Sequence, residues 1–416
     1  MQSGVAFVAF ESGVGEEATG VSGIHRGARA DAPARAAALT EIAPAFSLTS
    51  RVNPPYAARM QKSDGMNYAP EGKPAPVVGP GEFVFAAVAL DHGHINGQCQ
   101  GLTEAGGELR YVYDPDPAKV EAFCKRFPTA KPLPSIDAVL ERKDVQLVSA
   151  AAVPSERGPL GLRVMDAGKD YFTDKTPFTT LQQLADARTK VADTGRKYMV
   201  YYSERLHVEC AVRAGQLIDQ GAIGRVVQVL GLGPHRSSPA SRPDWFWLRE
   251  KTGGILCDIG SHQFEQFLHY TGASSARVIH AQVANYHHKD RPEFEDWGEA
   301  NLIADNGATN YIRVDWLNPQ GLRTWGDGRT FILGTKGYIE LRKYLDVARD
   351  AEGDQLYLVD DQGEQHIRCH GEVGFPYFGA LILDCLHRTE NAMTQEHAFR
   401  AAELCLQAQA MAQRIE

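Results

Sequence analysis

The stretch KTGGILCDIGSHQFEQFLHYTG, residues 251–272, contains an acid and an imidazole at a spacing that suits proton transfer. Asp258 and His262 are four residues apart, so on a helix they would lie on the same face, opposite the apolar side chains. An Asp beside a His can be a surface ion pair worth at most ~1 kcal/mol, or a device that moves a proton. The stretch alone leaves both interpretations open.

A second group of chemically active residues follows the apolar run FVFAAVAL at 83–90. A strand, a glycine turn, a helix and a second strand ending in an acid are typical of dinucleotide binding. The acid is Asp114, whose carboxylate can accept a hydrogen bond from a ribose hydroxyl; alternatively it only forms the turn before Pro115. No basic residue follows it directly, so NAD is favoured over NADP. The expected cofactor contacts in the turn ALDHGHINGQ are Asp91, His92, Gly93, His94, Ile95 and Asn96.

This turn departs from the expected pattern G-x-G-x-x-G. Asp91 and Asn96 stand where the first and third glycines belong, and only Gly93 matches. Asp91 would repel a pyrophosphate unless it points away. Asp91, His92 and His94 could instead ligate a divalent metal, but further ligands at a recognisable spacing are missing, so we expect no metal.

Composition restricts the class of protein. A chain of 416 residues is too long for one compact core, which predicts two domains. A net charge of −9 argues against nucleic-acid or anionic-membrane partners and favours small molecules. The longest apolar run has eight residues, which is too short for a membrane span. Seven cysteines without CxxC spacing fit a reducing compartment, and with no visible secretory signal we expect a cytoplasmic protein.

The rhythm of the sequence divides the chain. Residues 1–65 lack sustained periodicity and are expected to be a poorly ordered appendage, and Met66 is a candidate natural start. A lead-in rich in proline follows at 66–82. Residues 83–205 alternate β-rich and helical runs, which predicts a doubly wound parallel sheet that binds a dinucleotide. Residues 206–416 contain long strand-like runs joined by short turns, which predicts an α+β substrate-binding and oligomerisation domain with a large, mostly antiparallel open sheet. The last helix either packs on the first domain or on this sheet.

Four features in order resemble the Gfo/Idh/MocA family of oxidoreductases: the βαβ start, TDKTPF after a later strand, GAIGRV before the second domain, and GGILCDIGSH. The family's block G-G-x-x-x-D-x-G-x-H is matched without a gap from Gly253 to His262. Its Glu-Lys-Pro block is matched more loosely by the run from Asp174 to Pro177, in which Thr176 separates the lysine from the proline. The resemblance covers residues 83–416 and implies a Rossmann-type first domain.

The resemblance implies that Lys175, Asp258 and His262 are catalytic. An imidazole can take the hydroxyl proton as hydride leaves the alcohol carbon, and an ammonium near the reacting oxygen stabilises the developing alkoxide. Asp258 would bind a neighbouring hydroxyl or hold the imidazole. Taken singly, these residues could also be a solvated strand end, a helix N-terminal carboxylate and a surface histidine.

Further contacts are expected at the ends of neighbouring elements. Pro154, Asp174 and Lys175 are expected beside the cofactor, and Arg157, at the place of a family histidine, beside its phosphates or an anionic substrate. Polar and aromatic side chains on loops near the domain junction suit a polyol. With Asp258 and His262, the expected substrate contacts are Tyr202, Glu204, Arg205, His235, Arg242 and Trp245.

The resemblance therefore implies an NAD-dependent dehydrogenase that acts on a secondary hydroxyl of a cyclic polyol, sugar or sugar derivative. It also implies a homodimer or homotetramer formed through the C-terminal sheet. Two alternatives stay open. One is redox-neutral, NAD-assisted cleavage of a glycoside on the same fold. The other, suggested by the altered glycine turn, is a ligand-sensing protein that binds NAD or a ligand without turnover.

Overall fold

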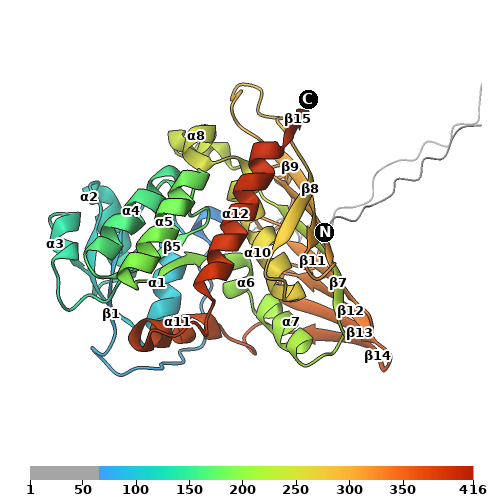
Figure 1. Cartoon of the computed structure of the whole chain (residues 1–416), viewed down its shortest axis with the longest axis horizontal. Coiled ribbons are helices and arrows are strands. Elements are labelled where there is room, and N and C mark those ends of the chain that lie inside the picture. Colours follow the sequence, from blue (N-terminus) through green and yellow to red (C-terminus); the bar gives the residue numbers. More distant parts are fainter. Residues whose placement is uncertain (1–64, 416) are drawn as a thin grey trace, which may run out of the picture. The chain divides into compact units, whose positions relative to one another are not determined.

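The computed structural model describes residues 65–415 (Figure 1). The expectations about residues 1–64 lie outside this range. Among the helices of residues 65–415, none combines the length and the apolar character that crossing a membrane would need.

The first half of the described chain forms a six-stranded sheet in which all neighbouring strands run parallel. The strand order is β3-β2-β1-β4-β5-β6, so the direction of winding reverses between β1 and β4. Ligands of such sheets bind beyond the carboxyl ends of the strands at this reversal. The strands are β1 (Val84–Val88), β2 (Glu108–Tyr113), β3 (Lys131–Pro132), β4 (Leu147–Ala150), β5 (Asp170–Asp174) and β6 (Tyr198–Tyr201).

Helices connect these strands, and several begin and end on signals visible in the sequence. Pro117 occupies the first turn of its helix, where its missing N–H is no loss, and the side chain of Asp116 caps that helix by accepting from the Ala118 N–H. Gly195 ends another helix with a φ of 62°, a left-handed conformation that suits glycine. The helices are α1 (Ile95–Glu104), α2 (Pro117–Arg126), α3 (Ile136–Leu140), α4 (Pro154–Asp166) and α5 (Leu181–Thr194).

The second half forms a mixed, mostly antiparallel nine-stranded sheet with the order β14-β13-β12-β11-β7-β10-β9-β8-β15. Two of its pairs, β7 with β10 and β8 with β15, run parallel. The strands are β7 (Val226–Pro234), β8 (Ala276–Ala284), β9 (Trp297–Ala304), β10 (Thr309–Asp315), β11 (Arg329–Gly334), β12 (Gly337–Arg342), β13 (Gln355–Asp360), β14 (Gly363–Arg368) and β15 (Gln413–Ile415).

Helices of the second half link the two sheets. Helix α12 contacts α5 beside the first sheet and α10 and β8 of the second half, and Figure 1 shows it in red alongside α5 and α10. The helices are α6 (Ser203–Leu206), α7 (Glu209–Asp219), α8 (Arg249–Thr252), α9 (Ile255–Asp258), α10 (Gly260–Thr271), α11 (Pro376–His387) and α12 (Gln395–Met411), with 3-10 turns η2 (Gly65–Asn67), η3 (Pro239–Ser241) and η4 (Asp244–Trp247).

The predicted elements differ from the structure in several places. Strand β3 and helices α3 and α11 were not predicted, and a two-residue strand such as β3 has no period to detect. The last residues, predicted as helix, form β15 because they pair with β8. The stretch 251–272 was predicted as one helix but is divided at Ile259 into α9 and α10.

A buried ion pair joins α6, just after the first sheet, to the second sheet. Glu204 on α6 accepts from Lys343 Nζ at 2.7 Å, and both side chains are at most 2% exposed. Gln263 of α10 donates to the same carboxylate oxygen at 2.9 Å. Gln263 fits there because Gly231 and Gly233 have no side chains on the face of β7 that it contacts. A Cβ on either glycine would lie under 3 Å from the side-chain amide of Gln263. Burial alone would raise the pKa of Glu204, but the Lys343 ammonium and nearby imidazoles hold it well below its usual range.

Removing one charge of this pair should destabilise the protein more than removing both charges. We expect Glu204→Gln to lower the free energy of unfolding by roughly 3–5 kcal/mol, because Lys343 is left buried without a counter-ion. Adding Lys343→Met should recover most of that loss. Denaturant unfolding of the two variants measures this, and a double variant less stable than the single one would contradict it.

Candidate active site

A cavity lies between the carboxyl end of the first sheet and the loops and helices of the second half; we name it the junction cavity. Lys175, which directly follows β5, and Asp258 of α9 both line it. Side chains from η4 and the second sheet complete it. Its lining consists of Gly65, Met66, His92, His94, Pro154, Arg157, Lys175, His235, Arg242, Trp245, Phe246, Thr252, Asp258 and Trp316.

Lys175 and Asp258 form an ion pair in this cavity. Lys175 Nζ lies 2.5 Å from Asp258 Oδ1, and the side chains are 5% and 17% exposed. Burial would raise the pKa of Asp258, but the Lys175 ammonium lowers it, so the carboxylate stays ionised. Because 83 residues separate the two, only the packing of the two halves brings them together. The pair places an ammonium and a carboxylate where a polyol's hydroxyls could bind.

Asp174, at the end of β5, is fully buried and holds the surrounding loops. It accepts from His94 Nδ1 at 2.9 Å and from Arg157 Nη2 at 3.1 Å, and His92 Nδ1 lies 3.4 Å away. Burial opposes ionisation, but His94 and Arg157 keep the pKa of this carboxyl well below its usual range. The two imidazoles and the carboxylate lie close enough to hold a metal ion, yet Arg157 already supplies the positive charge.

Arg157 is buried and supports the backbone around Lys175. Its side chain is 1% exposed, and its guanidinium donates to the carbonyls of Ala152, Lys175 and Thr176 and to Asp174. It also belongs to the lining of the junction cavity. Its expected contact with the cofactor's phosphates or an anionic substrate stays a prediction.

His262 lies deeper than Asp258. It is 2% exposed and, unlike Asp258, does not appear in the lining of the junction cavity formed by the described residues. Its buried Nδ1 has no hydrogen-bond partner among residues 65–415. Burial lowers the pKa of His262 to about 3, with Lys175 also disfavouring the charged form and Glu204 opposing it. The imidazole is therefore neutral at physiological pH.

The turn after β1 can be tested against a dinucleotide. The predicted repulsion by Asp91 is offset, because Lys119 of α2 pairs with it at 2.6 Å. Asp114 at the end of β2 accepts from the backbone N–H groups of Leu90 and Asp116, one on each oxygen, and each oxygen keeps a second lone pair. Gly93, with no side chain, directly precedes the start of α1, whose N-terminus favours anions. These groups suit a dinucleotide, while Met66 and Asn67 occupy the space beside Gly93.

The other residues expected beside the cofactor are placed as follows. His92, His94 and Pro154 line the junction cavity. Ile95 is a core residue at the start of α1, and Asn96 donates to the Gly93 carbonyl at 3.1 Å. The last two therefore shape the turn.

Besides Asp258, three of the expected substrate contacts line the junction cavity: His235, Arg242 and Trp245. His235 Nδ1 lies 3.1 Å from the Gly233 carbonyl, so in the neutral ring Nδ1 donates and Nε2 is free to accept. Burial lowers the pKa of His235 to about 4. Arg242 stacks over the rings of Phe246 and Trp316 at 4.6 and 5.0 Å, which forms an aromatic wall.

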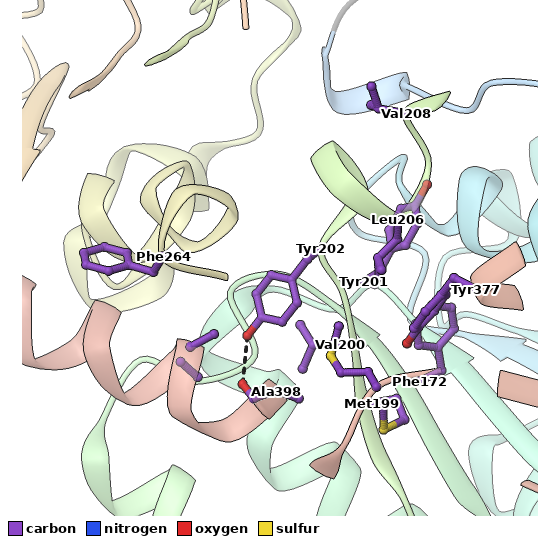
Figure 2. Packing of buried hydrophobic residues seen from close by; sticks show 14 of the residues in the cluster. Phe172, Met199, Val200, Tyr201, Tyr202, Leu206, Val208, Phe264, Tyr377 and Ala398 are labelled. Carbon is purple, nitrogen blue, oxygen red and sulfur yellow. Dashed lines mark hydrogen bonds between the residues drawn. The ribbon is translucent and has the colours of Figure 1, made fainter. Parts of the chain in front are cut away.

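Tyr202, Glu204 and Arg205 do not line the cavity in the described chain. Figure 2 shows the Tyr202 hydroxyl pointing to α12, where it donates to the Ala398 carbonyl at 3.0 Å. Arg205 is engaged with the buried carboxylate of Glu265, and Glu204 with Lys343. The partners of Tyr202 and Arg205 come from distant parts of the chain, and substrate contact by these two residues stays a prediction.

Sequence reasoning missed five lining residues: Gly65, Met66, Phe246, Thr252 and Trp316. Phe246 is adjacent to the predicted Trp245, and Thr252 directly precedes the block that begins at Gly253, so both could have been predicted from their neighbours. Trp316 follows β10 and carried no local signal. Gly65 and Met66 were assigned to segments before the first sheet, and their place in the site depends on tertiary packing.

Comparison with known proteins agrees with this architecture. Residues 76–202 match a family described as "Oxidoreductase family, NAD-binding Rossmann fold". Residues 211–340 match the GFO/IDH/MocA C-terminal domain. The two matches fall on the two sheets in the order that the sequence motifs indicated.

Individual relatives share this architecture. Scyllo-inositol 2-dehydrogenase (NAD(+)) of Bacillus subtilis (strain 168) is 24% identical over 265 residues, covering 62% of this chain and 73% of its own. The crystal structure of a candidate oxidoreductase from Erwinia carotovora atroseptica SCRI1043 is 49% identical with a TM-score of 0.78, covering 80% of this chain and all of that one. Levoglucosan dehydrogenase in complex with NADH and levoglucosan shares the fold at 15% identity, with a TM-score of 0.67, covering 79% and 97% of the two chains. The chain therefore belongs to the Gfo/Idh/MocA family of oxidoreductases.

Proposed function

We propose that the protein is an NAD-dependent dehydrogenase that transfers hydride between nicotinamide and a secondary hydroxyl of a cyclic polyol, sugar or sugar derivative. The observation that carries this proposal is the Lys175–Asp258 pair inside a cavity at the carboxyl end of a parallel sheet. Relatives whose names specify an inositol and levoglucosan support the substrate class. Asp114, with no basic residue directly after it, supports NAD over NADP.

The chain's own groups divide the work in this proposal. Asp114 and the turn at Gly93 hold the dinucleotide, and a bound NAD supplies the hydride acceptor. Lys175 stabilises negative charge on the reacting oxygen, and Asp258 accepts a hydrogen bond from a neighbouring hydroxyl. His262 takes the hydroxyl proton.

We retain a homodimer or homotetramer as a proposal. Large apolar side chains remain about 40% exposed on three strands of the second sheet: Ile279 at 41%, Ile303 at 39% and Leu333 at 38%. Such residues support association of this sheet with another copy.

Replacing His262 tests its role directly. We expect His262→Ala to lower turnover of a polyol substrate by roughly 10²-fold, the usual contribution of a positioned acid or base, with NAD affinity nearly unchanged. NADH formation and tryptophan fluorescence titration measure the two quantities. His235→Ala is the matched control, because His235 is also buried and neutral but lines the cavity. A loss confined to His235→Ala would transfer the role to that residue.

The low pKa of His262 predicts the shape of the pH profile. An ordinary histidine, with a pKa of about 6.5, would lose basic activity as the pH falls through that value. Burial lowers the pKa of His262 to about 3, so kcat/KM should show no decline between pH 7.5 and pH 5.5, an interval of about two units. A midpoint close to the ordinary histidine value in the free enzyme would contradict the buried, neutral imidazole.

Lys119 should control dinucleotide affinity. In Lys119→Ala the charge of Asp91 faces the turn without its partner, so NAD should bind roughly fivefold more weakly, an effect of about 1 kcal/mol. NADP should weaken more, because its additional phosphate would lie near Asp114, 4.0 Å from Lys119 Nζ. Fluorescence titration measures both, and Asp91→Asn in the same background should restore NAD binding. Unchanged affinity in Lys119→Ala would contradict the compensation.

NADH production separates the alternatives. Steady NADH formation from a polyol would exclude the redox-neutral cleavage of a glycoside. Failure to bind either NAD or NADH would exclude both enzymatic functions and leave ligand sensing, which the altered glycine turn supports.

A further inference from the structure

Residues 65–68, which we name the blocking segment, lie against the turn on which a dinucleotide would bind. Gly93 stands at the second glycine of the pattern G-x-G-x-x-G, where the lack of a side chain lets a pyrophosphate approach the backbone. A Cβ on Gly93 would lie 2.5 Å from the Met66 carbonyl oxygen and 2.4 Å from the side-chain oxygen of Asn67. The chain itself therefore fills the space beside Gly93 that a pyrophosphate needs.

The blocking segment continues along the first turn of α1. A Cβ on Gly97, in that turn, would lie 3.1 Å from the Tyr68 carbonyl oxygen. The N-terminus of a helix favours negative charge, which is why phosphates bind there. The backbone oxygens of Met66 and Tyr68 and the side-chain oxygen of Asn67 thus bring partial negative charge to a place that suits a phosphate.

The junction cavity is closed in the same arrangement. Its volume is about 20 Å³, which holds about one water molecule. Gly65 and Met66 are part of its lining, together with Lys175 and Asp258. A nicotinamide ring is much larger than a water molecule, so it cannot enter beside Lys175 until part of this lining moves.

Gly65 holds one end of the blocking segment. Its carbonyl lies 3.0 Å from His94 Nε2 and accepts from the Tyr68 N–H at 3.2 Å. A Cβ on Gly65 would lie 2.7 Å from the indole of Trp325. Glycine is suited to such a close approach of backbone to a ring, so a larger residue at this position would push the segment away from Trp325.

Tyr68 holds the other end. Its ring packs edge-on against Trp325 and Tyr344, with ring centroids 5.6 and 5.5 Å apart. Its hydroxyl donates to the His207 carbonyl at 3.1 Å. Ring contacts and single hydrogen bonds are individually weak, so a ligand that binds well can displace the segment.

We propose that the blocking segment is an autoinhibitory element, which competes with NAD for the turn at Gly93 and leaves it when the dinucleotide binds. The inference rests on the proposed function, which supplies NAD as the ligand. Because the segment and the pyrophosphate need the same space, the affinity for NAD is reduced by the fraction of molecules in which the segment is in place. Loosening the segment therefore strengthens NAD binding without adding any contact to the dinucleotide.

Two variants loosen the blocking segment in different ways, and calorimetry with the full chain measures their affinity for NAD. Tyr68→Phe removes the hydroxyl that donates to His207 and should strengthen NAD binding roughly fivefold. Gly65→Val places a side chain against Trp325 and should strengthen it at least about tenfold. Val77→Ala is the matched control, because Val77 lines a separate cavity bounded by α1 and the 371–380 region, and NAD affinity should not change.

Hydrogen exchange distinguishes displacement of the blocking segment from its closure over a bound dinucleotide. The Tyr68 N–H is bonded to the Gly65 carbonyl within the segment. Saturating NAD should therefore speed exchange of the Tyr68 amide in wild type by about tenfold or more, while the amides of β1 stay protected. A segment that closed over the dinucleotide would exchange more slowly instead.

The outcomes separate this proposal from the proposed function. Stronger NAD binding in Tyr68→Phe and Gly65→Val, without NADH formation from any polyol, would support autoinhibition and remove only the dehydrogenase. Unchanged or weaker NAD binding in both variants, or slower exchange of the Tyr68 amide with NAD, would overturn autoinhibition and leave the dehydrogenase in place. No NAD binding by wild type or either variant would overturn both proposals.

Discussion

The buried carboxylate of Asp174 is the charge on which the candidate site depends. A carboxylate with no exposure is stable only beside cations and donors, because an unpaired buried charge costs several kcal/mol. His94 and Arg157 meet this need. Arg157 in turn donates to the carbonyls of Lys175 and Thr176, and His94 reaches Gly65. One charge thus fixes the turn after β1, the path of the chain at Lys175 and the position of Gly65.

Packing in the second half positions the opposite wall of the cavity. The bare face of β7 at Gly231 and Gly233 lets Gln263 of α10 approach the strand. Gln263 then donates to Glu204, whose charge is balanced by Lys343. Because Asp258 ends α9 immediately before α10, the position of this helix determines whether the carboxylate reaches Lys175. The close packing around Gly231 and Gly233 and the distance between Lys175 and Asp258 are therefore linked through α10.

The sequence predicted elements better than partners. Alternating β-rich and helical runs were enough to predict the parallel sheet, and the block from Gly253 to His262 indicated the family. The same spacing could not show that the helix divides at Ile259, so that Asp258 lines the cavity while His262 lies behind it. The partners of Arg157 and Arg205 could not be predicted either: residue type indicates a charge, whereas Asp174 and Glu265, which neutralise these charges, become neighbours only on folding.

The altered glycine turn shows why a motif read position by position can mislead. An aspartate at the place of the first glycine would expel an anion if it stood alone. Here Asp91 is paired with Lys119, 28 residues later and one turn into α2, so the local charge near the turn is balanced. At Gly93, where close approach still requires glycine, the neighbours are Met66 and Asn67. Lys119 of α2 thus balances the charge of Asp91, and residues 66–67 lie against Gly93. The properties of the turn therefore depend on these two distant segments as well as on its own residues.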